Sequence, residues 1–279
     1  MRLPLLIALS ATCFGSAFAQ SNWDKAYSVS SRPMLQVEVD NASVRVHSCG
    51  GCHTVHIHVD PKGGDLSRWH ITDMQGGSGI RFSMKHSEDR SLFVGWHGHA
   101  PEVIVDMPGE ADLTVHSGDG SLAVAGVRGA IELKTGDGSI ATEDTSGSLR
   151  INTGDGSVQV RRAEGTMTAG TGDGSMQMEG RFTQLEAHTG DGSMNITLLP
   201  GSNLQSSSRL TSGDGSISLT VPRDLHADVQ ASTGDGSIAN GLNMQTSSND
   251  RHSVHGLMNG GGPTLRLHSG DGSISMNAR

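Results

Sequence analysis

A single tetrapeptide, Gly-Asp-Gly-Ser, occurs eight times after residue 117 and dominates this sequence. The first five copies follow one another at intervals of 18 residues, and the later intervals are 23, 21 and 36 residues. The aspartates of the eight copies are Asp119, Asp137, Asp155, Asp173, Asp191, Asp214, Asp235 and Asp271. A fixed period of this length indicates a repeat architecture, in which each unit packs on its neighbours.

Within each 18-residue unit, apolar residues alternate with polar ones in two short segments. The first segment follows the tetrapeptide directly, with Leu122, Ile140, Val158, Met176, Met194, Ile217, Ile238 and Ile274 at equivalent positions. The second segment carries apolar pairs such as Ile131 and Leu133, or Leu149 and Ile151. Period-two alternation is typical of a strand with one buried face. Each unit therefore predicts strand, turn, strand, turn.

Two folds fit such a unit, an up-and-down hairpin or one coil of a β-solenoid. Identical turns at a fixed period favour the solenoid, because equivalent residues then stack about 4.8 Å apart. We expect an all-β protein in which residues 103–279 form a right-handed parallel β-solenoid with two strands per coil. Residues 20–102 form a less regular β region before it. The longer intervals predict loops that leave the coil at 199–208, 221–225 and 246–263.

Composition supports a thin, regular structure and excludes some function classes. The chain has 39 glycines and only nine aromatic residues, so a large aromatic core is excluded. Its 20 basic and 29 acidic residues give a net charge of −9, which argues against a nucleic-acid binder and against an anionic membrane surface as partner.

The first 19 residues have the pattern of a signal peptide. Arg2 precedes a short apolar stretch, and Ala17-Phe18-Ala19 matches an A-x-A cleavage site. The apolar stretch is too short to span a bilayer, and no later segment is long enough. We therefore expect an exported protein, periplasmic or extracellular, without a membrane span.

Two cysteines flank a glycine pair in the N-terminal region. We expect a hairpin around Gly50-Gly51, with Val46 opposite Val55, and a disulfide between Cys49 and Cys52 at its tip. The nearby histidines also allow a zinc or copper site, and free thiols or redox chemistry are a third alternative; these histidines are His47, His53, His56 and His58.

The chain resembles a known bacterial family at several places. Val103-Ile104-Val105-Asp106-Met107-Pro108-Gly109, then Leu113-Thr114-Val115 and the serial Gly-Asp-Gly-Ser units, is similar to the β-strand-repeat family called "putative adhesin". Asn41-Ala42-Ser43-Val44 is similar to the start of such proteins. The resemblance covers roughly residues 33–279. It implies an extracytoplasmic β-repeat protein, in a family whose function is unknown, and it implies no catalytic residues.

The repeated turn itself has two explanations. Glycine permits positive φ, and Asp and Ser side chains bond to backbone amides in turns, so the motif is sufficiently explained as structure. Alternatively, the eight aspartates line one edge about 5 Å apart, where calcium would offset their mutual repulsion. No other cofactor is expected.

The functional expectation follows from these features together. Gly-Asp-Gly-Ser lacks the nucleophile setting of G-x-S-x-G, and no other catalytic constellation is recognised in the sequence. We expect a non-enzymatic exported scaffold or surface-binding protein, whose partner is a cell-envelope or surface protein or a glycan. The alternative is a calcium-dependent module that uses the turn aspartates.

Overall fold

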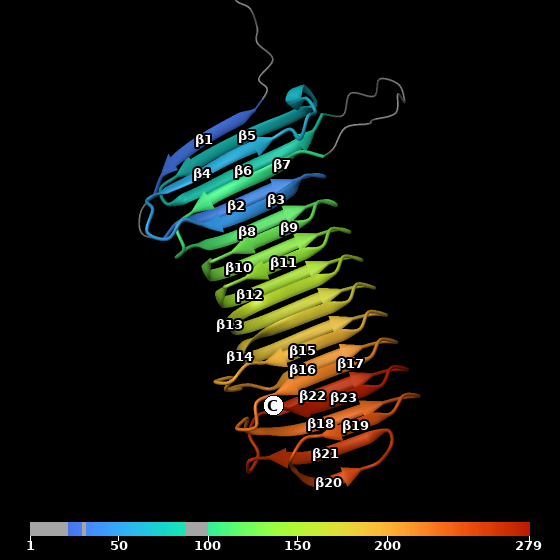
Figure 1. Cartoon of the computed structure of the whole chain (residues 1–279). Helices are drawn as coiled ribbons and strands as arrows, with labels where there is room; N and C mark the ends of the chain where they lie inside the picture. The colour runs from blue at the N-terminus through green and yellow to red at the C-terminus, as the bar shows by residue number, and fades with distance from the viewer. Residues whose placement is uncertain (1–21, 30–31, 88–99) are drawn as a thin grey trace, which may run out of the picture.

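The computed structural model describes residues 22–29, 32–87 and 100–279, and these are almost entirely β-structure. The predicted signal peptide lies outside the described residues. The only helical element in the described part is a single 3-10 turn, Leu66–Arg68. The predicted all-β class is confirmed. The strands form one 23-stranded sheet of mixed orientation, which folds into a long stack of coils (Figure 1).

The stack consists of two rows of strands whose buried sides face each other. In spatial order, the first row contains β5 (Trp69–Gly76), β6 (Gly79–His86), β2 (Met34–Val39), β8 (Asp112–Ser117), β10 (Arg128–Thr135), β12 (Ser146–Thr153), the second halves of β13 (Val158–Thr171) and β14 (Met176–Thr189), β16 (Ser208–Ser212), β22 (Thr264–Ser269), β18 (Ala227–Thr233), β21 (Ser253–Met258) and β20 (Gln245–Asn249). The second row contains β1 (Trp23–Ser28), β4 (Thr54–Asp60), β7 (Glu102–Met107), β3 (Ser43–Ser48), β9 (Leu122–Ala125), β11 (Ile140–Glu143), the first halves of β13 and β14, β15 (Met194–Leu198), β17 (Ile217–Val221), β23 (Ile274–Ala278) and β19 (Ile238–Gly241).

Consecutive repeat units pair in parallel, with a register of 18 residues. In the first row Ile131 pairs with Leu149, which pairs with Met167. In the second row Ile140 pairs with Val158. Each 18-residue unit therefore supplies one strand to each row, and one such unit is called a coil below.

The core is a narrow strip of small and medium apolar side chains between the rows. Ile140, Ile151 and Leu133 are at most 1% exposed, as period-two alternation predicts. Alanines at Ala169 and Ala187 are also buried, so the core stays thin in the middle of the stack. The outward positions of the same strands are polar, which leaves two regular outer faces.

The N-terminal strands continue the same stack. Strand β2 lies between β6 and β8, and β3 lies between β7 and β9, all in parallel. Strands β1, β4 and β7 then pair antiparallel and close one end of the second row, while β5 and β6 form an antiparallel hairpin on the first row. The segment 76–79 is the tight turn of that hairpin.

The hairpin predicted between Val46 and Val55 is wrong. Strand β7 lies between β3 and β4, so Val46 pairs with Val105, and Val105 pairs with Ile57. Alternation in β3 and β4 correctly predicts which side chains of each strand are buried. That set of side chains is the same whichever strand is the neighbour, so alternation does not identify the neighbour. The Cys49–Cys52 segment therefore crosses over the end of β7 instead of closing a hairpin.

The C-terminal coil is also out of sequence order. Strands β22 and β23 lie between the coil of β16 and β17 and the coil of β18 and β19. Outside them, β18, β21 and β20 pair antiparallel. The structure thus keeps loops at 199–207 and 222–226, but the loop predicted at 246–263 is wrong, because most of that stretch forms β20 and β21. Within residues 103–279, the antiparallel pairing of β18, β21 and β20 therefore corrects the uniformly parallel solenoid that was predicted.

Candidate functional site

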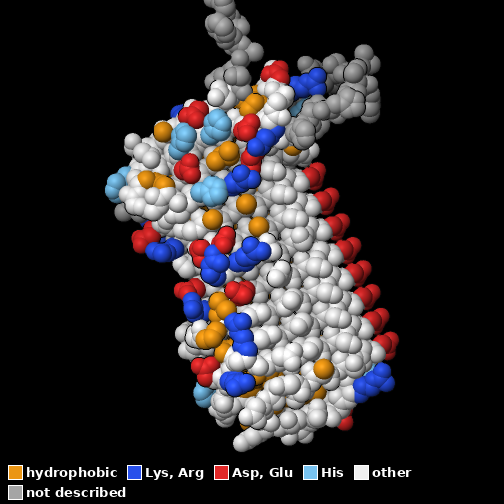
Figure 2. All heavy atoms as spheres, viewed as in Figure 1, with side chains coloured by type: hydrophobic (Ala, Val, Ile, Leu, Met, Phe, Trp, Pro, Cys, Tyr) orange, Lys and Arg blue, Asp and Glu red, His pale blue; other side chains and the backbone are white. Residues whose placement is uncertain are grey.

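The eight Gly-Asp-Gly-Ser turns stack along one edge of the molecule. In spatial order their aspartates are Asp119, Asp137, Asp155, Asp173, Asp191, Asp214, Asp271 and Asp235. All eight are exposed, and Figure 2 shows a regular column of acidic side chains along this edge. None of the eight forms an ion pair within the described part of the chain. The same part contains no group of three or more His, Cys, Asp or Glu side chains that could hold a metal ion.

The motif glycines are required because the turns of neighbouring coils stack closely. The expectation that these glycines adopt positive φ is wrong. None of the sixteen has φ in the left-handed region. A Cβ at Gly156 would lie 2.0 Å from the carbonyl oxygen of Gly138. At the second glycine of the other seven motifs, a Cβ would lie 1.9–2.3 Å from a carbonyl oxygen of the neighbouring coil. Positive φ instead marks the opposite turn, where Gly147 and Gly165 have φ of 111° and 117°.

A buried column of hydroxyls runs beneath the aspartate edge. The residue before each motif is Ser or Thr, and its hydroxyl donates a hydrogen bond to a carbonyl of a neighbouring coil, which is a glycine carbonyl in seven turns and the Ala42 carbonyl for Ser117. Thr153 Oγ1 donates to the Gly138 carbonyl at 2.8 Å, and Thr189 Oγ1 to the Gly174 carbonyl at 3.0 Å. These bonds satisfy carbonyl groups that the tight turns would otherwise leave buried without a donor.

One strip of the outer face of the second row, beside the motif serines, is uncharged over several coils, while Glu143, Arg161 and Glu179 lie on the same strands beyond it. A shallow groove of about 690 Å³ runs along it between a column of motif serines and a column of small polar residues. Ser139 and Ser157 share a hydrogen bond of 3.0 Å, and Gln159 and Gln177 lie side by side on neighbouring strands. This face offers repeated hydroxyl and amide groups at the strand spacing.

The outer face of the first row is charged. A groove of about 700 Å³ lies near the 199–207 loop, and its lining includes Glu186, His188, Arg209 and Arg266. Arg209 and Arg266 are directly opposite each other on neighbouring strands. The described residues provide neither of these two guanidinium groups with an ion pair. The sequence signal for this groove is the recurrence of charged residues at the same position of successive units.

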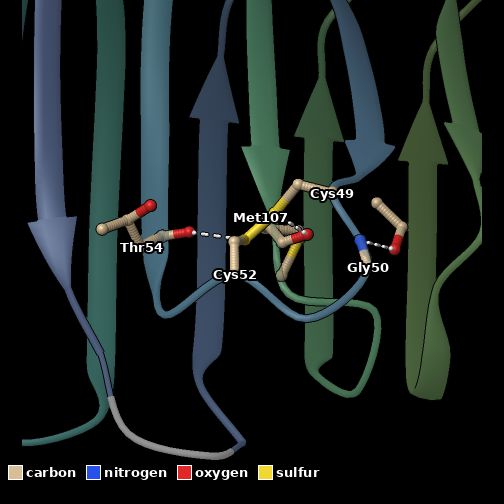
Figure 3. The surroundings of a disulfide bond; sticks show 6 residues. Cys49, Gly50, Cys52, Thr54 and Met107 are labelled. Atoms are coloured by element: carbon tan, nitrogen blue, oxygen red, sulfur yellow. Dashed lines mark hydrogen bonds between the residues drawn. A yellow bond between two sulfur atoms is a disulfide. The ribbon is translucent and has the colours of Figure 1, made fainter.

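The structure joins Cys49 and Cys52 in a disulfide at the end of β3, with Cα atoms 5.8 Å apart (Figure 3). Backbone hydrogen bonds hold the same segment: the Cys49 amide donates to the Met107 carbonyl at 2.9 Å, and the Gly109 amide to the Gly50 carbonyl at 3.3 Å. A groove of about 330 Å³ adjoins it. Because both sulfurs are bonded to each other, they are unavailable as thiolate ligands for zinc or copper.

The N-terminal histidines are brought together with an aspartate of the edge strand β1. His56 Nε2 lies 2.8 Å from one carboxylate oxygen of Asp24, and His58 Nδ1 lies 3.1 Å from the other. The hydrogen bond from His56 is the main cause that lowers the pKa of Asp24 below its usual value. These pairs tie β1 to β4 on the exposed face. His47 lies on β3, separated from β4 by β7, and does not contact Asp24.

No helix in the described ranges is both long and apolar enough to cross a membrane. No match was found among curated proteins.

Solved structures match most of the chain at low identity. A Parabacteroides distasonis protein described as a "putative lipid binding protein" is 12% identical, with a TM-score of 0.54, covering 92% of this chain and 97% of its own. A Bacteroides fragilis protein described as a "putative adhesin" is 13% identical, with a TM-score of 0.49, covering 93% and 98%. The family model described as Toastrack DUF4097 matches residues 34–277. This match spans most of the sequence, and the chain belongs to the Toastrack DUF4097 family.

Proposed function

We propose that the protein is an exported, solenoid-like scaffold that binds a cell-envelope or surface component through the uncharged groove on the outer face of its second row. The observation that carries this proposal is the groove of about 690 Å³, lined on successive coils by the same few polar side chains. A repetitive ligand, such as a neutral glycan, presents groups at regular spacing. Weak contacts on successive coils then add through effective concentration, without a deep pocket.

Family membership and the N-terminal sequence pattern support the same proposal. A relative is described as a "putative adhesin", and the signal-peptide pattern of residues 1–19 is typical of an exported chain. Binding through the groove needs no catalytic group. The lipid-binding description of the Parabacteroides distasonis protein is the second suggestion among the relatives, and the uncharged groove is less suited to a lipid headgroup, because it has no cation for a phosphate.

The test uses the fluorescently labelled mature chain and isolated cell envelopes. We expect saturable binding that falls at least tenfold when Ser175 and Gln177 are both replaced by Glu, because two carboxylates then enter the groove. Arg150→Glu on the first row adds a comparable charge change on the other face and should bind as the wild type does. Equal binding by all three proteins, or binding that does not saturate, contradicts the proposal.

The rival role is a calcium-dependent module in which cations screen the aspartate column. The exposure of all eight aspartates without ion pairs in the described residues favours it. A thermal melt with calcium and with chelator separates the two roles. A calcium-dependent rise in midpoint that disappears in the Asp155→Asn, Asp173→Asn double variant would favour the module, and an unchanged midpoint would leave the scaffold.

A further inference from the structure

Three side chains at the C-terminal end of the stack form a hydrogen-bonded chain of serine, histidine and aspartate. Ser247 Oγ lies 2.9 Å from His255 Nδ1, and His255 Nε2 lies 2.7 Å from Asp228 Oδ1. The residues come from β20, β21 and β18, which are neighbouring strands of the antiparallel end. A carboxylate only accepts hydrogen bonds, so neutral His255 carries its proton on Nε2 and presents the lone pair of Nδ1 to the serine hydroxyl, which also lies 3.2 Å from the His255 carbonyl oxygen.

The placement of Ser247 has a local cause. Thr246 pairs with Gly256, and Ser248 pairs with His255, so Ser247 is the extra residue of a β-bulge. A bulge redirects a side chain out of the strict alternation of its strand. Here it directs the serine hydroxyl toward the histidine of the adjacent strand, while the residue remains exposed.

The aspartate is held in turn by a residue of its own strand, β18, and by one of the neighbouring strand β22. Gln230 Nε2 donates to Asp228 Oδ2 at 3.2 Å, and Arg266 donates from its guanidinium to Gln230 Oε1 at 2.9 Å. Asp228 is only 25% exposed, against 45% for His255. Both oxygens of the Asp228 carboxylate are therefore engaged, which fixes the orientation of the imidazole behind the serine.

The chain contains a second serine–histidine pair, which has no aspartate behind the histidine in the part of the chain that the structure describes. Ser232 Oγ lies 3.0 Å from His268 Nδ1 on the exposed face of β18 and β22. Among the described residues, no carboxylate contacts the other ring nitrogen of His268. The two serine–histidine pairs have nearly the same separation and differ in the aspartate behind the histidine.

We propose that Ser247 is a reactive nucleophile that accepts a short acyl group from an activated ester, with His255 as its base and Asp228 as the positioning residue. In this step Ser247 Oγ bonds to the ester carbonyl carbon while its proton passes to His255 Nδ1. The carbon–oxygen bond to the leaving alcohol breaks, and the alcohol takes the proton from Nδ1. Asp228 stabilises the imidazolium in between. The open surface suits small acyl groups, and this chemistry is independent of the proposed surface binding.

The experiment exposes the mature chain to p-nitrophenyl acetate and locates the acetyl group by peptide mapping, with a fluorophosphonate probe as a second label. We expect one label per chain, on Ser247, and a rate that falls in acid as protonation removes the base. Ser247→Ala should lose the label. His255→Gln should slow labelling at least 100-fold, because general-base assistance contributes about that much. Asp228→Asn should slow it at least tenfold.

The controls separate chemistry from folding. Ser248→Ala should keep the wild-type labelling rate, and Ser232 should label far more slowly than Ser247 within the same molecule. Circular dichroism and thermal melting check that each variant keeps its fold; should His255→Gln melt early, the acid dependence of the wild-type rate and the ratio of Ser247 to Ser232 labelling decide. Labelling of both serines at equal rates, labelling that persists in Ser247→Ala, a rate independent of pH, or no label at all would overturn the proposal.

Discussion

The hydroxyl of Ser269 donates a hydrogen bond to the carbonyl of Gly215, 2.9 Å away, although 54 residues separate the two in sequence. On the other side, Thr233 Oγ1 donates to the carbonyl of Gly272 at 2.7 Å. The last coil of the chain is therefore bonded on both sides by coils that precede it.

This placement makes the last coil essential to its neighbours. Deletion of residues 264–279 should leave β18 and β19 without their parallel partners and expose the edges of β16 and β17. We expect amide hydrogen exchange in β18 and β19 to lose its protection, while β10 and β12 stay protected. A stack in simple sequence order would instead keep β18 and β19 protected, and that result would contradict the observed order.

The close stacking of the turns predicts a large effect from one methyl group. Gly156→Ala places a Cβ 2.0 Å from the Gly138 carbonyl oxygen, so the backbones of two coils must separate. We expect a loss of about 3 kcal/mol in the free energy of unfolding. Gly76→Ala is the matched control, because its Cβ has nothing within 4 Å, and it should change stability by less than about 0.5 kcal/mol. Urea denaturation measures both.

A charge in the thin core should not be tolerated. Ile151 is 1% exposed, and Ile151→Asp buries an unpaired carboxylate, which should cost about 4 kcal/mol or more. Ile151→Val should cost only about 1 kcal/mol. The neighbouring Arg150 is exposed, so Arg150→Ala should be close to neutral. Similar midpoints for Ile151→Asp and Arg150→Ala in thermal unfolding would show that residue 151 faces solvent.

Asp112 predicts a specific acid sensitivity. The Arg32 guanidinium, 2.7 Å away, and the Ala130 amide, 2.9 Å away, lower the pKa of Asp112 below its usual value of 3.8. A carboxyl group whose pKa is lowered by folding stabilises the fold above its unfolded pKa, and this contribution is lost as pH falls through the folded value. The stability difference between wild type and Asp112→Asn should therefore be present at pH 7 and shrink below about pH 4.

An NMR titration of the Asp112 carboxyl group checks the cause directly. Arg32→Ala should raise the pKa of Asp112 toward its ordinary value, because the guanidinium is the largest influence on it. An unchanged pKa in this variant would mean that the ion pair does not form in solution.

The disulfide predicts the thiol content of the mature protein. Thiol titration after denaturation without reductant should find no free thiol from Cys49 or Cys52. After reduction, the fold should persist with a modest loss of about 2 kcal/mol, because the disulfide closes a short loop that backbone hydrogen bonds also hold. Two free thiols with stoichiometric zinc in the unreduced sample would instead support the metal alternative.

The sequence predicted which side chains face the core, because alternation is a local property of each strand. Ile140 and Ile151 are buried at the positions that the 18-residue period gives them. The same alternation does not contain the identity of the neighbouring strand. The pattern predicted Val46 and Val55 as a hairpin pair, but β7 lies between their strands. Pairing between distant chain segments depends on contacts that no local pattern encodes.

The order of the coils and the serine–histidine–aspartate chain were unpredictable for the same reason. The interval of 36 residues before Asp271 equals two periods, and its length does not indicate that the last coil lies between two earlier ones. Ser247, His255 and Asp228 carry no motif in sequence, and a bulge in β20 and two antiparallel pairings bring them together. The motif glycines were expected to serve positive φ, which is wrong; their cause is the short distance between coils, which only the stacked turns reveal.

At each end of the rod, strands in antiparallel pairing lie outside the parallel repeat: β1, β4 and β5 at one end, and β20 and β21 at the other. The parallel 18-residue register is thus a property of the interior of the stack. Adding or removing one interior unit of 18 residues changes the length by one strand spacing of about 4.8 Å. Such interior units would change only the length of the molecule, because the strands at its two ends stay the same.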